Sequence, residues 1–516
     1  FLLFYNLDRV FIIDQPAARI FMAQKNLPGL FLRSPDITHP RLEYIVLHIF
    51  THFGGIGEFT ARLPSVLFGI GSFLAFFFLL RRYTRPATAL AGTILLVLSP
   101  RILEHARDVG NFSMFIFFSI LSTHFFLRTI LFPPGEQPPK STGALYIVST
   151  TLMAYSNYFF VFILAGQAGM WLYLLAAEGK RNTGTALNWL AAFVLSLPSL
   201  GGLLRDFFID LPLRQAAAKS SLVAHGGMSH IEYIHDLAGY YFPLIKAPHN
   251  SILVLPAFIL ILVISHLATG LNIRKYRINI YVLITVLVTL VVNIAFVSLA
   301  RLKDYYIVFL VPLFHLFLLV GIEGFCREQV RNRTARSAVL ALFLAVLAAT
   351  QAASLLWQWD SLYADRRQTS IAPVMEHVRR HTSRSSCLVF EHHGISWLVL
   401  YYGYSAPLEV ADIEGNTYFV DDDGNAFMEH PELSFRSILP LHGFADEKEL
   451  GEKTYRNLMD IPWKKFWFIQ DKTRYTEPVN DFLHTECEYE MGTEKYELFF
   501  CYREGKKADR GPDRAL

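Results

Sequence analysis

Residues 61–81 read ARLPSVLFGIGSFLAFFFLLR, a mostly apolar run that ends at Arg81 and Arg82. A helix needs roughly 20 predominantly apolar residues to cross a bilayer, so this run predicts a transmembrane helix. More apolar runs follow it, near 86–100, 113–133, 143–157, 158–178, 186–204, 251–271, 278–299, 304–325 and 337–357. The pattern predicts a polytopic α-helical membrane protein.

The composition of the whole chain agrees with this prediction. Of its 516 residues, 53% are hydrophobic and only 18% are charged, and the mean hydropathy is positive. These values exclude an ordinary soluble protein of this size. Four cysteines are too few for a disulfide-built scaffold and show no metal-binding spacing.

The first apolar run, residues 1–13, is too short to span a bilayer by itself. We interpret it as the end of a first transmembrane helix. A cleaved signal peptide is the alternative, although no basic n-region or small-residue cleavage site is visible. With this first helix, the expected number of spans is about eleven.

Basic clusters give the orientation of these spans, because cytoplasmic loops carry an excess of Lys and Arg. The clusters follow every even-numbered span, at 81–85, 128–140, 180–181, 274–277 and 327–336. The opposite loops, 14–60, 101–112 and 205–250, are therefore expected to share the outer face of the membrane. An odd number of spans places everything after residue 357 on that face as well.

Residues 358–516 are charged and lack any long apolar run. Short strand-like runs occur at 387–391, 466–470 and 496–502, with helical patterns near 371–381 and 395–402. We therefore predict two domains: a transmembrane domain at 1–357, with a first outer loop at 14–60, and an extracytoplasmic soluble α/β domain at 358–516.

Two cysteines of this second domain, Cys487 and Cys501, flank a predicted hairpin turn at Gly492 and Thr493. Two interpretations stay open at this point. The cysteines form a disulfide on the oxidising outer face, or they are unpaired small residues of the domain core.

Two acids on the predicted outer face are candidates for chemistry. Asp14 and Asp108 each lie within a few residues of a predicted helix end, near Arg9 and Arg107 respectively. A carboxylate at such a position is costly to bury unless it is paired or used. The alternative for each is a solvated acid at the membrane interface.

The predicted spans contain few ionisable residues, which argues against an ion-coupled transporter. Polar groups gather instead at the outer helix ends beside aromatic residues, as suits a substrate with an apolar tail and a polar head. Arg301 and Lys303, between the ninth and tenth spans, are candidates to bind a phosphate head group. The alternative for each is an interfacial anchor.

Several motifs resemble, in the right order, the lipid-dependent membrane glycosyltransferases of the GT-C fold. The resemblance is to the bacterial relatives of the protein O-mannosyltransferases and of the aminoarabinose transferase of lipid A. Asp14-Gln15 stands where the family carries Asp-Glu. DITHPRLEY at 36–44 is similar to D-x-x-H-P-P-L-Y-Y, EFTARLPS at 58–65 to E-x-x-x-R-L-P-S, and HARDVGNFS at 105–113 to Y-A-R-E-A-R-P-Y-S.

The resemblance implies an inverting glycosyltransferase that moves a sugar from a polyprenyl-phosphate donor to a protein, lipid or glycan acceptor. It implies Asp14 as the general base. The implied substrate-binding residues are Asp36, His39, Arg41, Arg107, Asp108, Arg301, Lys303 and Tyr305. It implies a divalent metal in some members, and we assign no metal ligands here. Membrane lipids are expected contacts and nucleic acid is not, with a bacterial cytoplasmic membrane as the expected location.

The chain also departs from the family pattern. Gln15 replaces a Glu, Arg41 replaces a Pro, Gly110 replaces an Arg, and Tyr305 stands where Arg is usual. These departures favour the alternative function, a non-catalytic membrane scaffold or a polysaccharide assembly or export subunit on the same fold.

Overall fold

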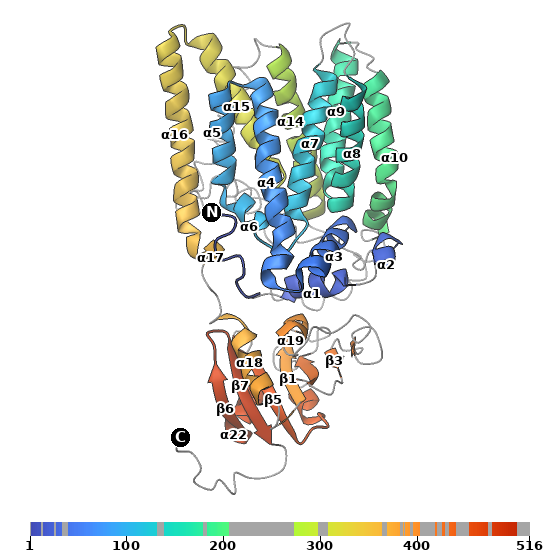
Figure 1. Cartoon of the computed structure of the whole chain (residues 1–516), viewed down its shortest axis with the longest axis vertical. Helices are drawn as coiled ribbons and strands as arrows, with labels where there is room; N and C mark the ends of the chain where they lie inside the picture. The colour runs from blue at the N-terminus through green and yellow to red at the C-terminus, as the bar shows by residue number, and fades with distance from the viewer. Residues whose placement is uncertain are drawn as a thin grey trace.

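The computed structural model describes residues 2–11, 14–24, 27–32, 40–131, 139–178, 183–205, 273–297, 308–363, 369–381, 385, 387–392, 396–402, 418–420, 426–428, 433–439, 454–472 and 477–502. Long helices run side by side in a bundle, and a smaller α/β part lies at one end of it (Figure 1). Three short helices, α1, α2 and α3, occupy the end of the bundle that faces the α/β part.

Long helices coincide with the predicted spans. They are α4 (Glu58–Tyr83), α5 (Pro86–Val97), α7 (Phe112–Ile130), α8 (Lys140–Ser156), α9 (Phe160–Glu178), α10 (Thr183–Arg205), α14 (Ile273–Val297), α15 (Leu310–Gln329) and α16 (Arg333–Trp357). The predicted run at 251–271 lies outside the described residues. Within the described residues, five helices are long and apolar enough to cross a membrane, or six with one bent pair. Eleven spans therefore stay a prediction.

The bent pair consists of α5 and α6 (Pro100–Ala106), whose axes differ by 67°. Pro100 is the cause, because proline disfavours helical geometry in the residue before it. Ser99 accordingly has extended backbone angles, φ −68° and ψ 114°. The bend brings α6 and the turn that follows it to the end of the bundle where α1 and α3 lie.

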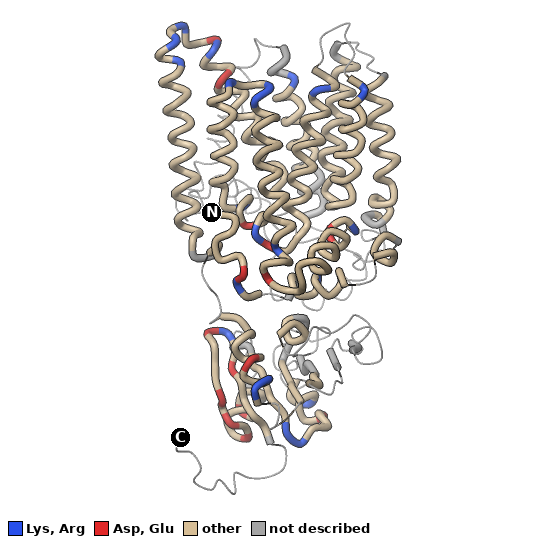
Figure 2. Tube along the Cα trace, in the orientation of Figure 1, with Lys and Arg blue, Asp and Glu red and all other residues tan. Residues whose placement is uncertain are grey.

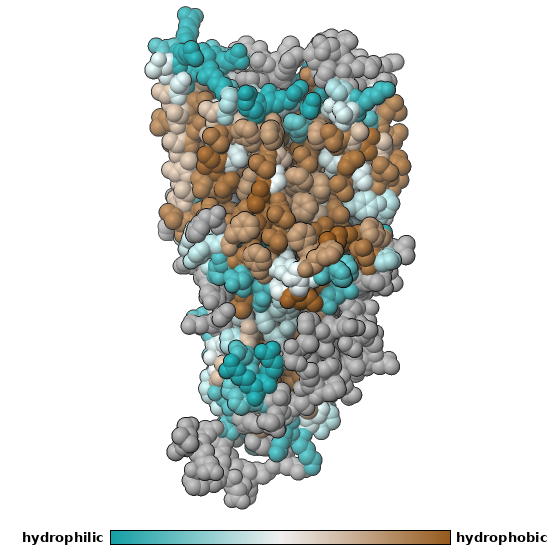
Figure 3. Space-filling model, viewed as in Figure 1, coloured by the Kyte–Doolittle hydropathy of each residue, from teal (hydrophilic) through white to brown (hydrophobic). Residues whose placement is uncertain are grey.

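The bundle has an apolar belt between two polar ends. Hydrophobic side chains cover its middle (Figure 3), and Lys and Arg gather mainly at the end far from α1 (Figure 2). Arg81 and Arg82 at the end of α4 and Arg327 at the end of α15 belong to that basic end. The α1 end has both acids and bases. We call these the basic end and the α1 end of the bundle.

Glycine allows a close approach between α9 and α14. A Cβ atom built on Gly166 would lie 2.1 Å from the Thr285 hydroxyl and 3.0 Å from its Cα. The backbone contact means that moving one side chain would not make room.

We therefore expect Gly166→Ala to destabilise the protein by about 1–3 kcal/mol through overpacking. Gly201→Ala in α10 is the matched control, because its Cβ would meet no atom of the described residues within 4 Å. Alanine at an exposed helix position is neutral or stabilising. Thermal midpoints of the two variants in detergent measure the difference. Equal midpoints would show that α9 and α14 do not approach this closely.

The prediction that residues 1–13 form the end of a transmembrane helix is wrong. Residues 2–8 form turns, not the end of a transmembrane helix. The carbonyls of this segment are engaged by arginine side chains of the bundle: Arg107 donates to Tyr5, and Arg62 donates to Leu7. These carbonyls bind guanidinium groups instead of helical N–H groups, so the segment is held without a helix.

The predicted outer loop at 14–60 is also largely helical where it is described. It contains α1 (Asp14–Ala23), α2 (Leu27–Leu32) and α3 (Leu42–Gly54). The apolar residues of α3 bury one face, with Tyr44 and Leu47 inside. Sequence patterns of 6–13 residues were too short to separate these helices from loop.

The α/β part contains α18 (Ala372–Arg380), β1 (Cys387–His392), α19 (Ser396–Tyr402), β2 (Tyr418–Val420), β3 (Ala426–Met428), β4 (Ser434–Leu439), β5 (Lys465–Asp471), α22 (Glu477–Glu486), β6 (Cys487–Gly492) and β7 (Tyr496–Tyr502). Its sheet has the order β2-β3-β4-β1-β5-β7-β6. β1 is parallel to β4 and β5, and the other pairs are antiparallel. The predicted strands at 387–391, 466–470 and 496–502 and both predicted helices are confirmed.

Side chains alternate between the two faces of this sheet, as the period of a strand requires. Phe390 and Trp467 pack on one face with Met375 of α18. Phe468 packs on the other with Leu483 of α22. The first cluster also contains residues of α1 and α3, among them Ile20. The sheet, α1 and α3 therefore share one hydrophobic core.

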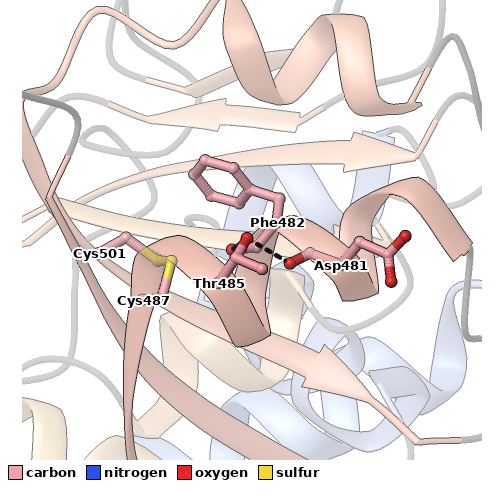
Figure 4. The surroundings of a disulfide bond; sticks show 5 residues. All are labelled: Asp481, Phe482, Thr485, Cys487 and Cys501. Atoms are coloured by element: carbon pink, nitrogen blue, oxygen red, sulfur yellow. Dashed lines mark hydrogen bonds between the residues drawn. A yellow bond between two sulfur atoms is a disulfide. The ribbon is translucent and has the colours of Figure 1, made fainter. Parts of the chain in front are cut away.

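A disulfide joins β6 to β7. Cys487 and Cys501 are register partners on the two strands, and their sulfur atoms are bonded. Thr485, whose hydroxyl donates to the Asp481 carbonyl at 2.6 Å, lies beside the bond at the end of α22 (Figure 4). Of the two interpretations left open by the sequence, the structure has the disulfide.

Replacing both Cys487 and Cys501 by Ser is expected to lower the stability of the α/β part by about 2–4 kcal/mol, because the bond restricts the unfolded chain. Cys387→Ser is the control, since Cys387 lies on β1 of the same sheet and is not part of this disulfide. Limited proteolysis with and without reductant measures the effect. A double variant as resistant as the control would contradict the prediction.

Candidate functional site

The candidate site lies at the α1 end of the bundle. There α1, α3, the first turns of α4, and the turn between α6 and α7 come together. Each carries at least one charged side chain that is shielded from water, and such charges are costly unless they are paired or functional.

The central ion pair joins α1 to α3. The Arg19 guanidinium donates to Glu43 Oε1, and only 4% of the Glu43 surface is exposed. Burial acts to lower the pKa of Arg19, but the Glu43 charge and hydrogen bond outweigh it and leave that pKa above its usual value. The second Glu43 oxygen, Oε2, is buried and has no hydrogen-bond partner among the described residues.

A cavity lies directly beside this pair. The empty space there amounts to about 270 Å³ when the open solvent at its mouth is included. Its lining is formed by Glu43, Val46, Leu47, Ala61, Pro64, Ser65, Phe68, Val109, Gly110 and Met114. The lining therefore combines apolar side chains with the polar side chains of Glu43 and Ser65.

Gly110 is one of the departures from the family motif, which carries Arg at this position. A Cβ atom at Gly110 would lie 3.3 Å from Arg19 Nη1. The missing side chain leaves room for the Arg19 guanidinium, so Arg19 brings a cation close to the place where the motif has one.

Arg62 and Arg107 form a second group that holds the N-terminal segment. Arg62 donates to the carbonyls of Leu7 and Arg9, and Arg107 donates to those of Tyr5 and Leu362. Burial and the nearby Arg9 charge lower the pKa of Arg107 to about 10, so it stays charged at neutral pH. Both guanidinium groups thus have protein partners.

The spacing of the E-x-x-x-R motif has a structural reason. Glu58 and Arg62 are four residues apart and so project from one side of α4. Glu58 accepts a hydrogen bond from Tyr402 at 3.1 Å, and the Arg62 guanidinium lies 4.7 Å from the centre of the Phe11 ring. Both residues face the N-terminal segment.

The structure describes four of the nine predicted site residues: Asp14, Arg41, Arg107 and Asp108. Asp14 is the first residue of α1, close in sequence to the Arg19 pair. Asp108 lies in the turn before α7 and accepts from the Val109 N–H at 2.9 Å, and its charge contributes to the raised pKa of Arg19. Arg41 donates to the Phe31 carbonyl at 2.7 Å. Asp36, His39, Arg301, Lys303 and Tyr305 lie outside the described residues.

The sequence reasoning did not select Arg19 or Glu43. One signal was available for Glu43, because an acid stands where the quoted motif has the first of two tyrosines. Among the described residues, no three His, Cys, Asp or Glu side chains are grouped to hold a metal ion.

Comparison with known proteins identifies the fold. Residues 38–200 match the family of dolichyl-phosphate-mannose-protein mannosyltransferases. The crystal structure of ArnT from Cupriavidus metallidurans bound to undecaprenyl phosphate superposes with a TM-score of 0.57 at 12% identity, covering 97% of this chain and 96% of ArnT. The chain has the GT-C fold. The predicted resemblance is confirmed.

Two further structures share the GT-C fold with this chain. The apo form of the same ArnT matches with a TM-score of 0.54 at 12% identity, covering 97% of this chain and 96% of ArnT. The Archaeoglobus fulgidus oligosaccharyltransferase in complex with Zn and sulfate matches with a TM-score of 0.51 at 11% identity, covering 89% of this chain and 64% of that protein. No curated protein matches the sequence significantly. With its apolar helices, the chain is an integral membrane protein of GT-C fold.

Proposed function

We propose that this protein is an inverting glycosyltransferase that takes a sugar from a polyprenyl-phosphate donor. The acceptor is a hydroxyl or amine of a protein, lipid or glycan, and the reaction takes place at the α1 end of the bundle. The observation that carries the proposal is the cluster of shielded charges at this end, beside the cavity that Glu43 lines. The GT-C fold over nearly the whole chain supports it.

The chemistry needs a base and a place for negative charge. Asp14 removes the proton from the acceptor as its oxygen or nitrogen bonds to the anomeric carbon. The bond between that carbon and the phosphate oxygen breaks at the same time, with inversion. The polyprenyl phosphate leaves with the electron pair, and cationic groups stabilise its charge.

The other predicted residues have supporting roles in this proposal. Arg301, Lys303 and Arg41 bind the phosphate, with Tyr305 beside it. Asp36, His39 and Asp108 position the sugar or the acceptor. Arg107 was predicted to do the same. The carbonyls that its guanidinium binds favour a structural role for it.

Two observations support an outer-face location in a bacterial cytoplasmic membrane. The basic end of the bundle is the end expected in the cytoplasm, and the α/β part lies at the other end. The Cys487–Cys501 disulfide favours an oxidising compartment for the α/β part. Together they support an extracytoplasmic position for residues 358–516.

The direct test is transfer by the purified protein in liposomes. Polyprenyl-phosphate sugars are supplied together with membrane extract as the source of acceptors, and mass spectrometry detects the glycosylated product. We expect a sugar-mass increase on an acceptor, with inverted configuration at the anomeric carbon.

The alternative, a scaffold or an assembly or export subunit, predicts a different result in the same assay. No donor would be consumed, and the protein would co-purify with a stable partner. That outcome, repeated over several lipid-linked sugars, would reject the enzyme. The departures at Gln15 and Tyr305 are the observations that favour this second function.

A further inference from the structure

Phe11, three residues before Asp14, is held by the α/β part of the chain. Its N–H donates to the Tyr402 hydroxyl of α19 at 2.8 Å. Its carbonyl accepts from the Ser370 hydroxyl, just before α18, at 3.2 Å. Both polar backbone atoms of this one residue are therefore bound by side chains more than 350 positions away in sequence.

The Phe11 ring is fixed as well. The Arg62 guanidinium lies 4.7 Å from the ring centre on the bundle side, and the Tyr401 ring of α19 packs against it edge-on at 5.2 Å. Only 1% of Phe11 is exposed. Phe11 is therefore held by contacts from both the bundle and the α/β part, and we call this set of contacts the grip on Phe11.

Tyr402 connects this grip to the bundle. Its hydroxyl accepts from Phe11 and donates to Glu58 Oε1 at 3.1 Å. Burial and the negative charge of Glu58 raise the pKa of Tyr402, so its hydroxyl keeps the proton that it donates. One side chain of the α/β part thus joins the N-terminal segment to the first residue of α4.

The distance from this grip to the proposed base is short. Three residue steps lead from Phe11 to Asp14, so their Cα atoms are at most about 11 Å apart. Ala17 and Ile20 of α1 also belong to the core shared with the sheet. Phe11 and the first turns of α1 therefore belong to the same hydrophobic core as the sheet.

We propose that Tyr402 and Ser370 are positioning residues, through which the α/β part sets the place of Asp14. The inference rests on the proposed function, because it assigns Asp14 the role of base. A misplacement of about 1 Å can cost up to about 10²-fold in rate. The α/β part is then required for turnover, although it contributes no group to the reaction.

Steady-state transfer by the full-length protein tests this. Tyr402→Phe keeps the ring and removes the hydroxyl, and we expect kcat to fall about tenfold or more while KM for donor and acceptor changes little. Ser370→Ala should behave alike, and Ser370→Thr, which keeps the hydroxyl, should restore most of kcat. Tyr489→Phe is the control, since Tyr489 is 54% exposed on β6 of the same sheet. A kcat for Tyr402→Phe within twofold of the control would overturn the proposal.

Hydrogen exchange provides a measurement that does not depend on activity. In Tyr402→Phe, the Phe11 amide should exchange about two- to tenfold faster, as loss of one hydrogen bond predicts. An unchanged exchange rate would overturn the grip itself. If the wild-type protein transfers no sugar but the exchange rate rises, the grip stands and it is the proposed function that fails.

Discussion

Replacing Asp14 by Asn is expected to lower the rate of sugar transfer by about 10²–10⁴-fold, the usual contribution of a general base. The amide has nearly the same shape as the carboxylate but cannot accept the acceptor's proton. Since Asp14 is proposed to act on the acceptor, binding of the polyprenyl-phosphate sugar should change little. Initial rates in liposomes, combined with a titration of donor binding, separate the two effects.

Asp8→Asn is the matched control for this experiment. Asp8 is exposed on the same N-terminal segment, and the change removes the same charge. We expect its rate to stay within about twofold of the wild type, as for a surface substitution away from the site. Full transfer by Asp14→Asn would reject Asp14 as the base, and Asp108 and Glu43 would then be the candidates for that role.

The helical part of the fold could be predicted because each membrane span is specified by its own run of apolar residues. The apolar run at 61–81 and the observed α4 (Glu58–Tyr83) differ by only two or three residues at each end. A span must be apolar over its whole length, so its own residues suffice to identify it. The N-terminal run was predicted wrongly because its conformation does not depend on its own residues alone. It is apolar, but Arg62 and Arg107 from other parts of the chain bind its carbonyls.

The sheet could be predicted only in its central strands. β5 and β7 have 7 residues each, and each contains an apolar segment that predicted it. β2 and β3 have only 3 residues each, and such short strands exist because partner strands pair with them. The sequence could not show whether the disulfide forms, because the two cysteines come together only through the register of β6 on β7.

Contacts between residues distant in sequence also limit what could be predicted of the site. Asp14 was predicted from a sequence motif and stays a prediction, whereas Arg19 and Glu43 are 24 residues apart and meet only because α1 packs on α3. Arg107 has the residue type expected at a phosphate or sugar site. Its carbonyl partners lie 102 and 255 positions away, so no local pattern could reveal them.

The Arg19–Glu43 pair gives the largest expected effect on stability. Glu43→Gln leaves the Arg19 charge buried without its counter-charge, which is expected to cost about 3–5 kcal/mol. Glu104→Gln is the matched control, because the Arg101–Glu104 pair has 22% and 43% of its side chains exposed. Exposed pairs contribute about 0–1 kcal/mol. Thermal midpoints in detergent should therefore fall sharply for the first variant and hardly for the second.

A double variant then separates stability from function. Arg19→Met with Glu43→Leu removes both charges and keeps the volume, and such replacements of buried pairs are often neutral or stabilising. We therefore expect the double variant to recover the thermal midpoint that Glu43→Gln loses. If the Glu43 carboxylate faces the substrate in the cavity beside it, the recovered protein will still transfer sugar at least tenfold more slowly than the wild type. A stable double variant with full activity would show that the pair serves only to dock α1 on α3.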